Sequence, residues 1–255
     1  MEKGSIVGTI DAAQVVLYAF WVFFIGLILY LRREDKREGY PLVSDRRGGV
    51  SVIGYPRPPA PKIFRLAHGA PVLAPNGRAD PPVTTARPIA RWPGAPLEPT
   101  GDPMLAAVGP GAYANRADEP DLTVEGHDQI VPMRVATDFS IAVEDPDVRG
   151  LPVIAADRRV AGTVRDIWVD RAEIVIRYLE VELPDSRRVL LPWNFSRIDK
   201  RRGRVLVESI LARQFADVPA LRNPDRVTRL EEDQIVAYFG GGCLYATPAR
   251  AEPLL

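Results

Sequence analysis

The sequence predicts a single membrane-spanning helix, an extended proline-rich segment, and a mainly β domain with short C-terminal helices. Residues 12–31 carry no charge and span about 30 Å as a helix, the thickness of a bilayer's hydrocarbon core. Fourteen prolines lie between positions 41 and 103, and alternating β-branched residues begin after position 151. The expected divisions are residues 1–11, 12–31, 32–110 and 111–255.

The apolar helix is expected to begin after Asp11, because Asp11 and Gln14 have the spacing of a capping box. Four basic residues lie within positions 32–37, whereas only Lys3 precedes the helix. The positive-inside rule therefore predicts that residues 1–11 are periplasmic and that the C-terminal body is cytoplasmic. A cleaved signal peptide would instead carry its charge before the apolar core, so an anchor is the preferred interpretation.

Small residues on the helix suggest a packing surface. Ala12, Ala19 and Gly26 recur every seven positions, within about 40° of one another around the axis. Small side chains let a second membrane helix approach closely, although such residues are also simply common in membrane helices.

The cytoplasmic end of the helix suggests a lipid contact. Tyr30 lies at the expected interface, and the basic residues beside it have the charge to hold an anionic headgroup such as that of cardiolipin. These residues are Arg32, Arg33 and Lys36. Orientation signalling alone explains them equally well.

Composition limits the classes of function. The chain has 33 basic and 33 acidic residues, and this balance argues against nucleic acid as a partner. One cysteine excludes an intrachain disulfide and a thiolate cluster, and two histidines exclude a multi-histidine metal site within this chain. No nucleophile elbow, phosphate-binding glycine loop or metal-ligand spacing is present, so we expect neither an enzyme nor a metal site.

The proline-rich segment is expected to be extended rather than helical. Apolar islands at 62–66 and 70–73 favour short strands that lie along another surface over complete disorder. The later half is expected to form a small antiparallel barrel or a strongly curved sheet. Its expected strands are residues 160–170, 172–183, 188–193 and 203–209.

Two helices are expected after these strands. The first covers residues 210–216. The second begins after Thr228, where Thr228 and Glu231 form a capping box, and it is expected to end at the glycines 240–242.

Acidic residues gather near the predicted barrel, among them Asp170 and Glu173, with Arg177 close in sequence. A solvated surface with ordinary ion pairs explains this pattern, and so does a series of carboxylates that passes protons. A second titratable cluster consists of Glu125, His127 and Asp128. The residue pattern alone does not choose between these interpretations.

Several motifs resemble the family of H subunits of purple-bacterial photosynthetic reaction centres, in the right order and over essentially the whole chain. The matching motifs are YLRRED at 30–35, REGYPL at 37–42, PTGDPM at 99–104, VGP at 108–110, GLPV at 150–153, DIWVD at 166–170, RYLEVEL at 177–183, EED at 231–233 and GGCLY at 241–245. The resemblance implies that the later half is a PRC-barrel.

The resemblance also implies a role. H subunits bind no pigment; they cap the L and M subunits, which hold bacteriochlorophyll, bacteriopheophytin, quinones and non-haem iron, on the cytoplasmic side of the bacterial inner membrane. A cytochrome subunit and light-harvesting antenna belong to some such complexes. H subunits stabilise the complex and supply part of the proton route to the secondary quinone.

Some residue roles follow from matching motifs. Glu173 matches the family's internal proton-relay carboxylate, Asp170 the acid beside it, and Arg177 its basic neighbour. Only His127 matches a family histidine in the region where protons enter, so Glu125 and Asp128 are expected to substitute there. An alternative function is a membrane-tethered barrel adaptor that binds another protein or RNA.

Overall fold

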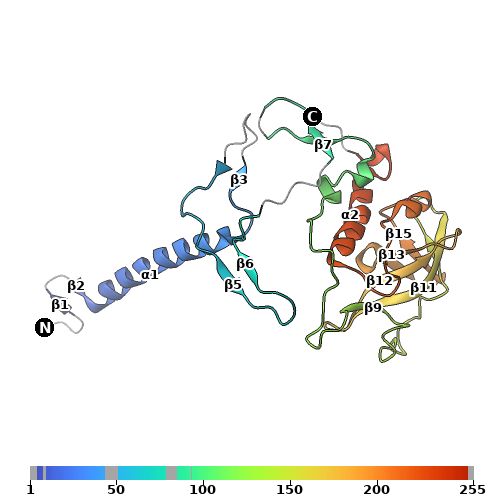
Figure 1. Ribbon diagram of the computed structural model, residues 1–255, viewed down its shortest axis with the longest axis horizontal. Coiled ribbons are helices and arrows are strands. Elements are labelled where there is room, and N and C mark those ends of the chain that lie inside the picture. Colours follow the sequence, from blue (N-terminus) through green and yellow to red (C-terminus); the bar gives the residue numbers. More distant parts are fainter. Residues whose placement is uncertain (1–4, 8–9, 44–50, 79–84, 93, 252–255) are drawn as a thin grey trace. The chain divides into compact units, whose positions relative to one another are not determined.

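The structure is a computed structural model that describes residues 5–7, 10–43, 51–78, 85–92 and 94–251 (Figure 1). Within the expected N-terminal stretch 1–11, residues 1–4 and 8–9 lie outside the described residues, Lys3 among them. The described residues belong to two compact units. One lies within Met1–Ala79 and Trp92–Gly94, and the other within Asp80–Arg91 and Ala95–Leu255.

The predicted apolar helix is present as α1, Ala12–Glu34, in the first unit (Figure 1). Its capping box is also present, because the Gln14 backbone N–H donates to Asp11 Oδ1 at 2.8 Å and the Asp11 N–H to Gln14 Oε1 at 3.3 Å. No residue of α1 is buried against the described part of the chain. An apolar helix left uncovered in this way is not a core helix, and its length suits a membrane span.

A 3₁₀ turn, Asp35–Arg37, follows α1 and fastens the proline-rich segment to its end. Arg37 Nη1 donates to the carbonyl oxygens of Ala60 and Ala74, both at 3.0 Å, while its other nitrogens pair with Glu34. The helix end and the described residues that follow it up to position 78 therefore belong to one folded unit.

The proline-rich segment is extended with short strands, as predicted. Two-residue or three-residue strands pair as separate antiparallel hairpins. These are β3 (Leu42–Val43) with β4 (Ser51–Val52), β5 (Lys62–Phe64) with β6 (Val72–Ala74), and β7 (Ala86–Pro88) with β8 (Leu97–Pro99). A further pair, β1 (Ser5–Val7) with β2 (Ile10–Asp11), precedes α1.

The second unit is built on a curved seven-stranded sheet in the order β13-β12-β11-β10-β15-β14, with β9 paired to β11. Pairing is antiparallel except between β10 and β15. The strands are β9 (Ile130–Pro132), β10 (Pro152–Ile154), β11 (Val160–Asp170), β12 (Val175–Glu182), β13 (Arg188–Pro192), β14 (Ser196–Asp199) and β15 (Arg204–Val207). Trp168, Leu179 and Leu191 are fully buried in its core.

The predicted strands 160–170 and 188–193 are confirmed almost to the residue, whereas the strand predicted at 172–183 begins later. Residues 171–174 form a turn in which Ile174 has φ of 57°, and β12 begins at Val175. The Asp170 carboxylate accepts from two backbone N–H groups of this turn and so ends β11. No strand was predicted at β9, β10 or β14, which are short and show little alternation, whereas the strand predicted at 203–209 is present as the shorter β15.

The final helix is α2, Arg229–Tyr245, and its Thr228 cap is confirmed. The predicted end at residues 240–242 is wrong, because the helix continues through all three glycines. A Cβ on Gly240 would lie 2.6 Å from the Pro110 carbonyl oxygen, and one on Gly242 would lie 2.3 Å from Ile210 Cγ2. These glycines serve close packing rather than a helix end. The helix predicted at 210–216 is a 3₁₀ helix, Ala212–Asp217, and another 3₁₀ turn, Pro248–Arg250, follows α2.

Candidate functional site

Asp170 lies at the end of β11 and is 1% exposed. Its carboxylate accepts hydrogen bonds from the backbone N–H groups of Ala172 and Glu173 at 2.9 and 3.0 Å. The side-chain amide of Gln129 donates to both of its oxygens at 3.0 Å. Every partner is a donor, so the buried carboxylate is well satisfied and fixes the turn that carries Glu173.

Glu173 projects from that turn, and its side chain is 63% exposed. Arg177, on β12, approaches it at 3.9 Å, and a second nitrogen of the same guanidinium lies 3.8 Å from Glu232 on α2. The structure thus brings together the three residues predicted from sequence, Asp170, Glu173 and Arg177. It also brings Glu232, which is far away in the sequence, close to Arg177.

Glu232 is buried, and it accepts a hydrogen bond from the Tyr178 hydroxyl at 2.9 Å. Burial raises its pKa above the ordinary range, although the bond from Tyr178 and the charge of Arg177 oppose the rise. Burial, together with the nearby Glu232 carboxylate, likewise raises the pKa of Tyr178, which stays a neutral donor.

Sequence reasoning did not select Glu232 or Gln129. Glu232 occupies the first turn of a capped helix, where acidic residues usually serve only the helix dipole. The matched motif EED at 231–233 was the one signal that pointed to it.

The cluster of Glu125, His127 and Asp128 lies in a tight loop before β9. The Thr123 N–H donates to the His127 carbonyl at 2.8 Å, and Glu125 and His127 are exposed. Gln129 follows directly, and its carbonyl accepts from the Arg171 N–H at 2.9 Å. The loop is therefore fastened at Gln129 to the turn that holds Asp170 and Glu173.

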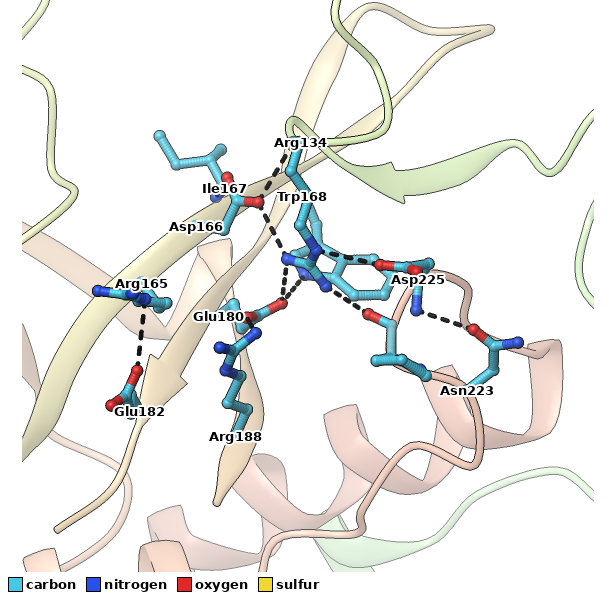
Figure 2. Close-up of polar contacts among 11 residues, drawn as sticks. Arg134, Arg165, Asp166, Ile167, Trp168, Glu180, Glu182, Arg188, Asn223 and Asp225 are labelled. Atoms are coloured by element: carbon cyan, nitrogen blue, oxygen red, sulfur yellow. Dashed lines mark hydrogen bonds and ion pairs between the residues drawn. The ribbon is translucent and has the colours of Figure 1, made fainter. Parts of the chain in front are cut away.

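A second polar cluster surrounds Arg134, just after β9 (Figure 2). One nitrogen of its guanidinium lies 3.0 Å from Asp166 and 2.8 Å from Glu180, and Nε lies 3.0 Å from Asp225. The indole N–H of Trp168 also donates to Glu180, at 3.0 Å. Burial lowers the pKa of Arg134, but the bonds to Glu180 and Asp166 outweigh it and hold that pKa above its usual value.

At the end of α1, the predicted lipid contacts differ in exposure. Tyr30, Arg32 and Arg33 are exposed, and Arg32 lies 3.6 Å from Asp35. Lys36 is instead buried at 3% exposure, and its ammonium donates to the backbone carbonyls of Ile53 and Pro56. The Lys36 ammonium is thus occupied by the chain itself.

The small residues of α1 are exposed. Ala12 and Ala19 are exposed, and a Cβ added to Gly26 would meet no atom of the described chain within 4 Å.

Among the residues that the structure describes, no three His, Cys, Asp or Glu side chains are grouped to hold a metal ion.

Two known families match this chain. Residues 141–214 match the PRC-barrel domain, which covers β10 to β15 of the sheet. Residues 4–135 match the family described as photosynthetic reaction centre, H-chain N-terminal region, and this match includes α1, the proline-rich hairpins and β9. The two matches follow each other in the order expected from the motifs. The chain belongs to the H-chain family of the photosynthetic reaction centre, as a subunit of a membrane-associated complex.

Proposed function

We propose that this chain caps the L and M subunits on the cytoplasmic side, stabilises the complex, and conducts protons toward the secondary quinone. L and M would hold bacteriochlorophyll, bacteriopheophytin, quinones and non-haem iron, while this chain binds none of them. It acts as an accessory subunit rather than an enzyme.

The observation that carries the proton role is the connected set Gln129, Asp170, Glu173, Arg177 and Glu232. Successive members are joined by a hydrogen bond or lie within 3.9 Å, from a loop with exposed titratable groups to a buried acid. Proton transfer requires titratable groups at short intervals, with pKa values adjusted by burial and neighbouring charge. Glu173 is both exposed and linked to this set, so it is the member that can exchange a proton.

The proposal for the membrane rests on α1. Its apolar side chains are exposed over the whole span, and the basic residues follow it. These features support a single-pass anchor in the bacterial inner membrane with residues 1–11 in the periplasm. The open faces at Ala12, Ala19 and Gly26 suit contact with the membrane helices of L and M.

Further partners follow from the same proposal. A cytochrome subunit and an antenna complex are expected neighbours. Arg32 and Arg33, beside Tyr30, are the available residues for an anionic lipid such as cardiolipin, since Lys36 is occupied. Unchanged lipid retention after both arginines are replaced by glutamine would remove the lipid from this proposal.

Purification of the detergent-solubilised protein from its native membrane tests the assembly. Bacteriochlorophyll and quinone that co-purify support the cap, and a colourless preparation supports the alternative adaptor. Flash-induced proton uptake in Glu125→Gln, His127→Ala and Asp128→Asn variants tests the route. The proposal predicts slower uptake in at least one of them, and wild-type uptake in all three would place the start of the route elsewhere.

A further inference from the structure

We propose that Arg134 is a positioning residue that fixes the first turn of α2, and with it the Glu232 carboxylate, against the β11–β12 hairpin. Its effect on proton transfer rests on the function proposed above. Its effect on Glu232 itself does not.

One side of Arg134 holds the hairpin. The same nitrogen bonds Asp166 of β11 and Glu180 of β12, which face each other across the strand pair. Glu180 is 2% exposed and also accepts from Arg188 at 3.2 Å, so its carboxylate is fixed from both sides (Figure 2). Breaking a buried charge cluster of this kind is costly, because it leaves an uncompensated charge.

The other side of Arg134 holds the loop that leads into α2. Nε bonds Asp225 (Figure 2), and a terminal nitrogen donates to the Pro224 carbonyl. The same loop is hydrogen-bonded to the first helical turn of α2. The Glu231 carboxylate accepts from the backbone N–H groups of Arg222 and Thr228 at 3.0 and 2.9 Å.

These contacts close a ring. From Arg134 the ring runs to Glu180, then two residues along β12 to Tyr178, whose hydroxyl bonds Glu232. Glu231, the residue before Glu232 in α2, leads back through the loop to Arg134. Arg134 is the member whose removal opens the ring at both the hairpin and the loop.

The charged groups around Glu232 come from three elements. Tyr178 and Arg177 face it from β12, Arg116 and Asp121 from the segment before β9, and Glu231 and Asp233 flank it on α2. A change at Arg134 leaves the charge of each of these groups in place. A shift in the titration of Glu232 would therefore report a change in its position or burial.

The test replaces Arg134 by Lys in the intact complex. A lysine ammonium retains the charge beside Asp166 and Glu180 but has no planar fork to hold Asp225 and Pro224 as well. The titration of Glu232 is followed by its carboxylic-acid carbonyl band in isotope-edited infrared spectra, assigned by its loss in Glu232→Gln. We expect the midpoint to move to lower pH, because a released first turn exposes the carboxylate to water.

Asp225→Ala serves as a second, milder variant, because Asp225 is about half exposed and its loss weakens only the loop side. Arg187→Lys is the matched control, since Arg187 also bridges a carboxylate and a carbonyl, those of Asp185 and Ala216. An unchanged midpoint in both test variants, or an equal shift in the control, overturns the inference. Should Arg134→Lys fail to fold, Asp225→Ala alone decides.

A kinetic readout connects Arg134 with the proposed route. Arg134→Lys should shift the pH profile of the proton-coupled electron transfer, and the shift should vanish when Glu232→Gln is also present. If Glu173→Gln leaves electron transfer unchanged, the proposed function fails. The infrared midpoint of Glu232 would still decide whether Arg134 positions it.

Discussion

The side-chain amide of Gln129 donates to both carboxylate oxygens of Asp170 at 3.0 Å. This bond joins the loop of His127 to the turn of Glu173, two segments that are far apart in sequence. Asp170 is buried, and its other bonds come from the backbone of its own turn. Gln129 is therefore the side chain that connects the two titratable clusters.

Gln129→Leu should lower the free energy of unfolding by about 1.5–3 kcal/mol, the usual contribution of a hydrogen bond to a charged group. It should also slow proton uptake, because the Asp170 carboxylate loses the side-chain donor that links it to the loop, while the backbone bond from the Arg171 N–H to the Gln129 carbonyl remains. Chemical denaturation and flash-induced uptake measure the two effects. Gln129→Glu, which places a like charge against Asp170, should destabilise more, and a stable Gln129→Glu variant would argue against the contact.

Tyr178→Phe should raise the pKa of Glu232 further, because the lost hydroxyl bond is one of the groups that oppose its rise. Infrared titration of the Glu232 carbonyl band measures this. A midpoint that falls would show that solvent enters the site and that the hydroxyl does not stabilise the carboxylate.

The raised pKa of Glu232 also predicts a pH dependence of stability. The folded state holds the proton more tightly than the unfolded state, so stability falls as pH rises from the ordinary value of 4.5 through the folded value. Glu232→Gln should remove this part of the fall. Denaturation midpoints measured across that pH range test it, and parallel curves for both proteins would contradict it.

Gly242→Ala should destabilise the fold by about 1–3 kcal/mol, because its Cβ would lie 2.6 Å from the Ser209 carbonyl oxygen as well as against Ile210. Gly241→Ala is the matched control, since its nearest contact is 3.4 Å and alanine favours the helix. Equal thermal stability of the two variants would contradict the packing role of the glycines.

Lys36→Met should loosen the segment around Ile53 and Pro56, whose carbonyl oxygens lose their ammonium donor. Limited proteolysis of the complex should then cleave this segment several-fold faster than in the wild type. Lys62→Met is the control, because Lys62 is exposed and its ammonium lies over the Phe64 ring. Equal cleavage in both variants would mean that Lys36 does not hold the segment.

The sequence predicted those parts of the fold that depend on local patterns. The apolar run, two capping boxes and the long alternating strand β11 each depend on residues that are close together in the sequence, and the structure contains all of them. The prediction for glycines 240–242 was wrong because Gly240 packs against Pro110 and Gly242 against Ile210, residues that lie far away in the sequence. A close approach between separate segments leaves no periodic signal.

The candidate site shows the same division. Asp170, Glu173 and Arg177 lie within eight residues and were selected from their motifs. Gln129 reaches them only because β9, which follows it, pairs with β11. Glu232 reaches them only because α2 packs so that it lies near Arg177. Lys36 was grouped with the lipid contacts by its sequence neighbours, but the fold turns its ammonium toward two carbonyls.

The most direct test of the proton-conducting role is the rate of the second, proton-coupled electron transfer to the secondary quinone after flash excitation of Glu173→Gln. Glu208→Gln is the matched control, because Glu208 is an exposed acid paired with Arg197 on the same barrel. The proposal predicts a slowing of roughly tenfold or more in Glu173→Gln, with an unchanged first electron transfer and a normal Glu208→Gln. Wild-type rates in Glu173→Gln, in a complex that assembles fully, would contradict it.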